Sequence, residues 1–176
     1  RTSFTFWAGM GHLPSDVAPD LRSRSYRLDA LVEPTRPGVC GVLIAHGDAT
    51  SGYSLYIDNE GHLVHDLNIG GSHQIVRSPE PVPEGSTSLG FHMSRAPEGH
   101  HGVGSLVVDG KAIASLETEN IFFLMISWSG LDVGMDRGTA VSHYETPNSY
   151  TGKLIKVTVE LDEDQILDGE GIGRSE

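Results

Sequence analysis

Cysteine is nearly absent from this sequence, because Cys40 is the only one among 176 residues. A single cysteine excludes an internal disulfide. Its place in the apolar run 39–45 favours a small buried hydrophobic residue over a reactive nucleophile. The lack of disulfides slightly favours a cytoplasmic over a periplasmic or secreted location, but the sequence does not determine the compartment.

Long apolar runs and basic residues are also scarce. No run approaches the roughly 20 apolar residues that a membrane-spanning helix needs. The chain has 12 Lys and Arg against 24 Asp and Glu, which gives a formal net charge of −12. A field of this sign repels phosphate backbones and anionic lipid surfaces. We therefore expect neither nucleic acid nor a membrane as a partner.

Helical periodicity is missing as well, since no segment of helical length repeats its apolar residues every 3.6 positions. Instead, short runs alternate apolar and polar residues between turns rich in Gly and Pro. The clearest run is 154–161, where Ile155, Val157, Val159 and Leu161 are expected to point to one side. Residues 120–128 are apolar on both faces, which fits either a buried strand or a covered loop.

Turn signals complete the prediction of the fold. Asp109-Gly110 joins residues 105–108 to 111–116 and predicts a two-residue type I′ hairpin, because both residue types tolerate positive φ. About ten to twelve such strands predict an all-β fold, a two-sheet antiparallel β-sandwich over residues 1–161. Residues 162–176 are acidic and glycine-rich, and we expect them to form a flexible tail.

No catalytic constellation emerges from the sequence. It contains no Gly-x-Ser-x-Gly elbow and no phosphate-binding loop. Nine histidines are present, but none shows the paired spacing of a zinc site. His62 and His65 fall on opposite faces of an expected strand and cannot share a metal there. The chain is therefore not expected to be an enzyme by itself, and no catalytic residue is assigned.

Two kinds of binding site stay open. Asp132 and Asp136, in the glycine-punctuated stretch 131–152, are candidate calcium ligands through carboxylate and carbonyl oxygens. The alternative is that both side chains cap turns of their own backbone. For sugars, aromatic side chains are candidate stacking platforms, with packing in the core or at an interface as the alternative. These aromatic candidates are Trp7, Tyr53, Tyr56 and Trp128.

A family resemblance rests on four segments. They are SFTFWAGMGHLPSDVAPDLRSRSYRLDALVE at 3–33, GYSLYID at 52–58, LVVDGK at 106–111 and LDVGMDRGTAVSHYETPNSYTGKLIKVTVEL at 131–161. Together they cover nearly all of residues 3–161, and the last is the most specific. On these segments the chain resembles the C-terminal domain of bacterial arylsulfatases of the alkaline-phosphatase superfamily.

The resemblance implies a concanavalin A-like jelly-roll sandwich that packs on and supports an N-terminal sulfatase catalytic domain. That family's formylglycine motif, Cys/Ser-x-Pro-x-Arg, is absent here, since Cys40 is followed by Gly-Val-Leu. The sulfate-ester chemistry would then belong to a part outside this chain. Phe122, Phe123 and Trp128 would face that catalytic domain. The alternative function is a lectin-like carbohydrate-binding module.

Overall fold

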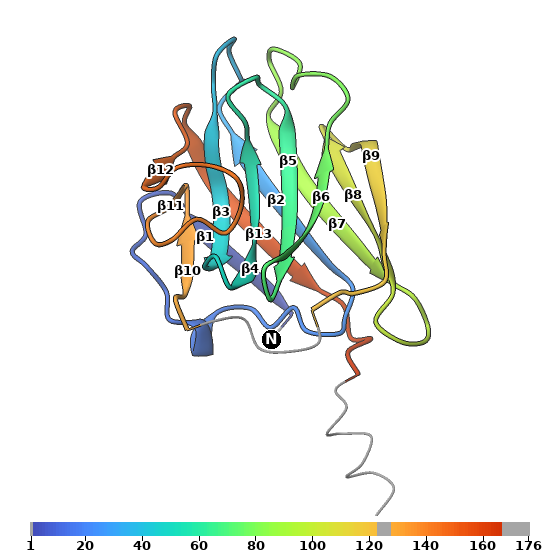
Figure 1. Ribbon diagram of the computed structural model, residues 1–176. Coiled ribbons are helices and arrows are strands. Elements are labelled where there is room, and N and C mark those ends of the chain that lie inside the picture. Colours follow the sequence, from blue (N-terminus) through green and yellow to red (C-terminus); the bar gives the residue numbers. More distant parts are fainter. Residues whose placement is uncertain (1, 123–127, 167–176) are drawn as a thin grey trace, which may run out of the picture.

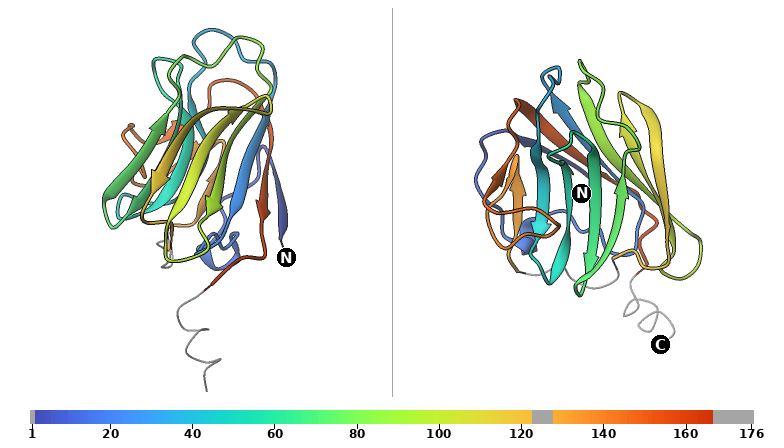
Figure 2. Two further views of the ribbon diagram at one scale, coloured as in Figure 1. Left: turned by 90° about the vertical axis from the view of Figure 1, so that its right-hand side faces the viewer. Right: turned by 45° about the horizontal axis from the view of Figure 1, so that its top comes forward.

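The computed structural model describes residues 2–122 and 128–166, which form two antiparallel sheets packed face to face (Figures 1 and 2). One sheet has six strands in the order β1-β13-β2-β7-β8-β9. Their bounds are β1 (Ser3–Trp7), β13 (Leu154–Leu161), β2 (Tyr26–Val32), β7 (Ser88–Arg95), β8 (Gly102–Val108) and β9 (Lys111–Thr118). The prediction of an all-β antiparallel sandwich is confirmed.

The second sheet has five strands in the order β10-β3-β4-β5-β6 and lies in front in Figure 1. Their bounds are β10 (Leu131–Val133), β3 (Gly41–Gly47), β4 (Ser51–Ile57), β5 (Leu63–Ile69) and β6 (Ser72–Arg77). A two-stranded ribbon of β11 (Met135–Asp136) and β12 (Asn148–Ser149) lies beside β3, and a 3-10 turn, η1 (Ser15–Val17), precedes β2. No helix in the described residues has the length and apolar character to cross a bilayer.

Strand β13 shows how the alternation of the sequence becomes a core. Val157, Val159 and Leu161 are buried between the sheets, as their period of two predicts. A register shift between Leu154 and Lys156 breaks the alternation at the start of the strand. Leu154 consequently joins the core while Ile155 is only half-buried, which corrects the predicted inward set by one position.

The Asp109-Gly110 hairpin between β8 and β9 is confirmed. Asp109 has φ +49° and Gly110 has φ +80°, the pair of positive values that a type I′ turn requires. The segment before β10 is different, because the described part of 120–128 forms no strand. Ile121 and Phe122 are buried in the core there as covered loop, and 123–127 lie outside the described residues.

Residues 162–166, the described part of the expected tail, continue along the loop that precedes β2. Ser25 donates to the Asp164 carboxylate from its backbone N–H at 2.8 Å and from its hydroxyl at 2.6 Å. The Gln165 side-chain amide donates to the Arg22 carbonyl at 2.8 Å. These contacts hold residues 162–166 against the sandwich, while flexibility of residues 167–176 stays a prediction outside the described residues.

Candidate functional site

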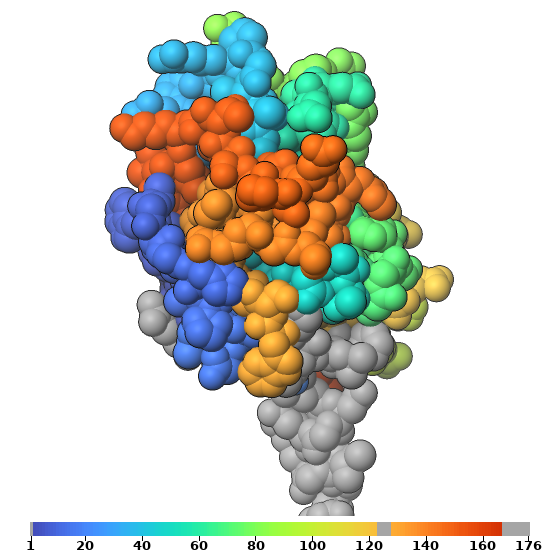
Figure 3. All heavy atoms as spheres, turned by 60° about the vertical axis from the view of Figure 1, so that its left-hand side comes forward, coloured from blue at the N-terminus to red at the C-terminus, as the bar shows by residue number. Residues whose placement is uncertain are grey.

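The outer face of the five-stranded sheet carries polar side chains that are nevertheless buried. Along β4 and β5, Ser54, Tyr56, Asp66 and Asn68 point away from the core, and all four are at most 6% exposed. The cause is residues 137–147, between β11 and β12, which we call the covering segment. It crosses this face in front of the sheet in Figure 1 and appears as an orange band over cyan and green strands in Figure 3.

Apolar packing and hydrogen bonds fix the covering segment on the sheet. Val141 of the segment packs with Val42, Ala45, Tyr56 and Val64 in a small hydrophobic cluster outside the main core. The Asn68 amide lies below it and donates to the Val141 carbonyl at 3.0 Å. A buried amide that holds a loop in this way fixes the position of the loop as well as stabilising it.

Two tyrosines extend the same contact. The rings of Tyr56 and Tyr144 meet edge to face, with centroids 4.9 Å apart and planes at 78°. The Tyr56 hydroxyl lies 3.0 Å from Ser142 Oγ, and the Tyr144 hydroxyl donates to the Asp136 carboxylate. Burial is the main reason that the pKa of Tyr144 is raised, and the Asp136 charge adds to it.

Both aspartates predicted to bind calcium lie under this segment, with protein donors on their carboxylates. Asp132 Oδ1 is 2.7 Å from His12 Nδ1 and 2.7 Å from Arg137 Nε, and Oδ2 accepts the Arg137 backbone N–H at 3.0 Å. Asp136 accepts from Tyr144 and from the Val141 backbone N–H. Each carboxylate thus accepts a backbone N–H of its own loop, as turn-capping would require, together with side-chain donors that include the Arg137 guanidinium on Asp132.

The surroundings of Asp136 act on its pKa in both directions. Burial raises the pKa of the Asp136 carboxyl, although the hydrogen bonds from Tyr144 and Val141 act against that shift. The nearby Asp132 charge raises it further. Calcium at this pair stays a prediction, and it would require the present donors to be displaced.

The predicted aromatic candidates are dispersed. Tyr53 is fully buried in the main core, and Tyr56 is covered as described. Trp7 is 59% exposed on the edge strand β1, and Trp128 is 74% exposed. Phe122 is 2% exposed and packs in the core, so its ring is not presented to a partner. Phe123 lies outside the described residues, and the interface role stays a prediction carried by Trp128.

A polar hollow of about 830 Å³ opens beside the covering segment, at the end of β4. Its side chains combine carboxylates, amides, an imidazole and the two tyrosine rings. They are contributed by Tyr56, Asp58, Asn59, Glu60, His143, Tyr144, Glu145 and Asn148. The turn after β4 and the covering segment form its two walls, so residues about 85 positions apart in sequence meet there. Sequence reasoning missed this site because only the fold brings the two walls together.

Charge in the hollow is mostly negative. Arg77 Nε donates to Asp58 Oδ2 at 2.7 Å, and Arg77 Nη2 lies 3.3 Å from Glu60 Oε2. Partial burial works to raise the pKa of Asp58, but Arg77 and the backbone N–H groups of His62 and Glu60 hold it below its usual value. Three carboxylates therefore line the hollow, Glu145 included, and the one guanidinium that pairs with two of them, Arg77, lies outside the lining.

Known proteins are similar to this chain in fold, but this similarity does not establish its function. No family model matches the chain, and no curated protein matches it. Among solved structures, it is similar to the CBM40 of the Ruminococcus gnavus IT-sialidase bound to alpha2,3 sialyllactose. That match has a TM-score of 0.60 and 19% identity, covering 99% of this chain and 96% of that one.

Two larger proteins share the fold over part of their length. Domains LG4-5 of the mouse laminin alpha1 chain match with a TM-score of 0.53 and 16% identity, over 96% of this chain and 44% of that one. The leech intramolecular trans-sialidase matches at 0.52 and 14%, over 98% and 27%. The chain is thus a concanavalin A-like jelly-roll sandwich, as expected. A link to sulfatases is not shown.

Proposed function

We propose that this chain is a lectin-like carbohydrate-binding module whose site is the polar hollow beside the covering segment. The hollow itself is the observation that carries the proposal. Its volume of about 830 Å³ lies within the roughly 300–1,000 Å³ typical of small-ligand sites. Its lining offers carboxylates and amides, which form directed hydrogen bonds with sugar hydroxyls, beside the half-buried ring of Tyr144.

The fold supports the proposal by analogy only. The R. gnavus CBM40 that this chain resembles is bound to alpha2,3 sialyllactose, and the match covers 96% of that module. Because a fold hosts many functions, the argument has to come from the site. Three carboxylates against one guanidinium repel an anionic sugar. We therefore expect neutral oligosaccharides to bind in preference to sialylated or sulfated ones.

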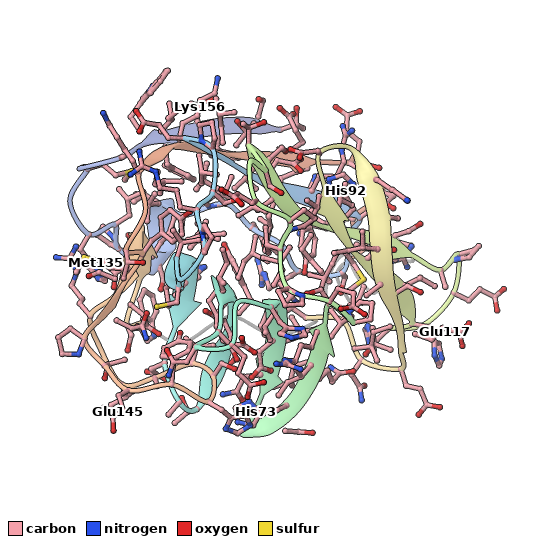
Figure 4. All side chains as sticks on the ribbon, turned by 90° about the horizontal axis from the view of Figure 1, so that it is seen from above. His73, His92, Glu117, Met135, Glu145 and Lys156 are labelled. Carbon is pink, nitrogen blue, oxygen red and sulfur yellow. The ribbon has the colours of Figure 1, made fainter. Side chains whose placement is uncertain are left out.

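A pair of glutamate variants tests the site. Glu145 and Glu117 are both exposed, but Figure 4 shows them on different sides of the molecule, with only Glu145 at the hollow. Glu145→Ala should weaken glycan binding by about 10- to 150-fold, since a hydrogen bond to a charged group is worth about 1.5–3 kcal/mol. Glu117→Ala should leave the affinity unchanged. Glycan-array screening followed by calorimetry provides the measurement.

Three outcomes of these binding measurements would contradict parts of the proposal. No binding to any neutral or anionic glycan would contradict the proposal. Equal loss in both variants, or loss in Glu117→Ala alone, would move the site away from the hollow. Tight binding of sulfated or sialylated glycans that survives Glu145→Ala would overturn the electrostatic argument.

A second candidate is the accessory domain of an arylsulfatase-like hydrolase, favoured by an exposed apolar stripe on the six-stranded sheet. Trp7, Lys156 and Leu31 are aligned across β1, β13 and β2, and Lys156 Nζ lies 5.3 Å from the centre of the Trp7 ring. Trp7 is 59% and Leu31 37% exposed, so this stripe is free to pack on a protein partner. Turnover of an aryl sulfate by this chain alone, or an unrelated coding sequence upstream of Arg1, would contradict this candidate.

A further inference from the structure

Three potential metal ligands converge on the outer face of the five-stranded sheet, next to the hollow. They are Asp66 on β5, His73 on β6 and His143 in the covering segment, and each offers one ligand atom within 4.8 Å of the others. Figure 4 shows His73 on the outer side of this sheet. Asp66 Oδ2 lies 2.6 Å from His73 Nδ1, and the rings of His73 and His143 have centroids 4.5 Å apart.

Asp66 is unusual among these three potential ligands, because its charged side chain is fully buried. Its Oδ2 has the His73 contact, whereas Oδ1 has no hydrogen-bond partner in the described structure. A buried carboxylate oxygen without a donor is costly, since it has lost its hydration and gained nothing in return. A cation bound at this oxygen would remove that cost.

The ligand types indicate which cation. Two imidazoles with one carboxylate suit zinc and the neighbouring first-row metals, whereas calcium and magnesium prefer oxygen ligands throughout. Ligand atoms around a tetrahedral zinc ion, at about 2.0–2.1 Å from the metal, lie about 3.4 Å from one another. The Asp66–His73 pair, now at 2.6 Å, would open to this spacing, and separations of up to 4.8 Å would close to it. His143 is exposed and His73 is a quarter exposed, so both rings have room to rotate.

We propose that Asp66, His73 and His143 form a binding site for a divalent transition metal of the zinc type. The three residues supply three ligands and leave a fourth position for water. The bound metal would join the covering segment to strands β5 and β6, and would thereby stabilise this segment on the outer face of the sheet. His143 also lines the hollow, so the two proposed sites share this residue. The metal proposal is nevertheless tested separately, because metal binding is measured without any glycan.

The experiment uses the 176-residue chain without an affinity tag, stripped of metal by dialysis against a chelator. Titration with Zn²⁺ by calorimetry, and with Co²⁺ by visible absorption, should show one ion per chain. Zn²⁺ should also raise the melting temperature, because a ligand that binds only the folded state stabilises it. His143→Ala is the principal variant, since this exposed side chain can be removed without opening the core.

His143→Ala should lower the affinity by at least the roughly 10–100-fold that loss of an outer-shell partner costs. The matched control is His92→Ala. His92 forms a similar pair with Asp29, at 2.9 Å, but on the six-stranded sheet, and no third ligand group joins that pair within the described residues. The control should bind Zn²⁺ as the parent chain does.

His73→Ala, checked for folding by circular dichroism, should reproduce the effect of His143→Ala. Absence of stoichiometric binding would overturn the proposal. Undiminished affinity in His143→Ala would overturn it equally, because the metal would then be held by other histidines.

Discussion

His65 on β5 is an ionisable side chain in the centre of the apolar core. It is 1% exposed, and its ring stacks on that of Phe91 with centroids 3.4 Å apart and nearly parallel planes. Burial lowers the pKa of His65 to about 3. His46 on β3 behaves similarly, with a pKa of about 4 for which burial is the main cause and His12 a smaller one. Both imidazoles are therefore neutral in the folded chain at neutral pH.

The depressed pKa values make stability depend on pH in a defined direction. The unfolded chain takes up a proton at each histidine near pH 6.5, whereas the folded chain keeps His65 neutral down to about pH 3. Stability is thus fully present above pH 6.5 and decreases as the pH falls toward 3, by up to about 1.4 kcal/mol per pH unit for each such histidine. We expect His65→Phe to reduce the slope of unfolding free energy against pH by the contribution of one histidine, which is up to about 1.4 kcal/mol per pH unit.

Urea unfolding of the parent chain and of His65→Phe between pH 7 and pH 5 measures the slope. The slope is the relevant quantity, because the substitution also changes packing at every pH. His101→Phe, in an exposed loop, is the matched control and should keep the slope of the parent chain. A slope in His65→Phe equal to that of the parent would contradict the assignment.

At the scale of single elements, the β8–β9 hairpin depends on the side chain of its first turn residue. Asp109 holds φ +49° and its Oδ1 accepts the backbone N–H groups of Thr87 at 3.0 Å and Ser88 at 2.9 Å. The turn is thereby joined to the start of β7, the neighbouring strand. Asp and Asn tolerate this backbone region, and alanine does not gain the local hydrogen bonds that compensate for it.

Asp109→Ala should therefore lower the free energy of unfolding by about 1–3 kcal/mol, from lost hydrogen bonds and left-handed strain together. Asp109→Asn keeps an acceptor oxygen and the tolerance for positive φ, so its loss should be clearly smaller. Chemical denaturation of the two variants beside the parent chain checks the order. Equal stability of the alanine variant and the parent would show that the turn does not need this side chain.

At the scale of the whole molecule, the sequence predicts the elements better than their arrangement. Alternation and turn residues are local signals, and they were sufficient for the sandwich and for the Asp109-Gly110 hairpin. The register shift at the start of β13 left no local signal, which is why Ile155, and not Leu154, was predicted to face the core. Strand order is harder still, because it depends on pairings between segments that are distant in the chain.

The candidate sites show the same limit. Asp66 and His73 lie in adjacent strands joined by Gly70-Gly71, and the hairpin register alone puts them on one face, so this pair was accessible from the sequence. His143 was not, because nothing local shows that the covering segment folds over β5 and β6. Asp132 and Asp136 were predicted as calcium ligands from their loop, which remains a prediction, and the sequence did not show their burial or their protein donors.

The position of β13 has a consequence for synthesis on the ribosome. β13 lies between β1 and β2, although it follows β2 by more than 120 residues. β1 pairs with β13 alone, from Ser3 opposite Glu160 to Trp7 opposite Lys156. During translation β1 therefore cannot form this pairing until β13, near the end of the described chain, has emerged. Contacts of such long sequence separation make folding slow and leave strand edges open to chaperones in the meantime.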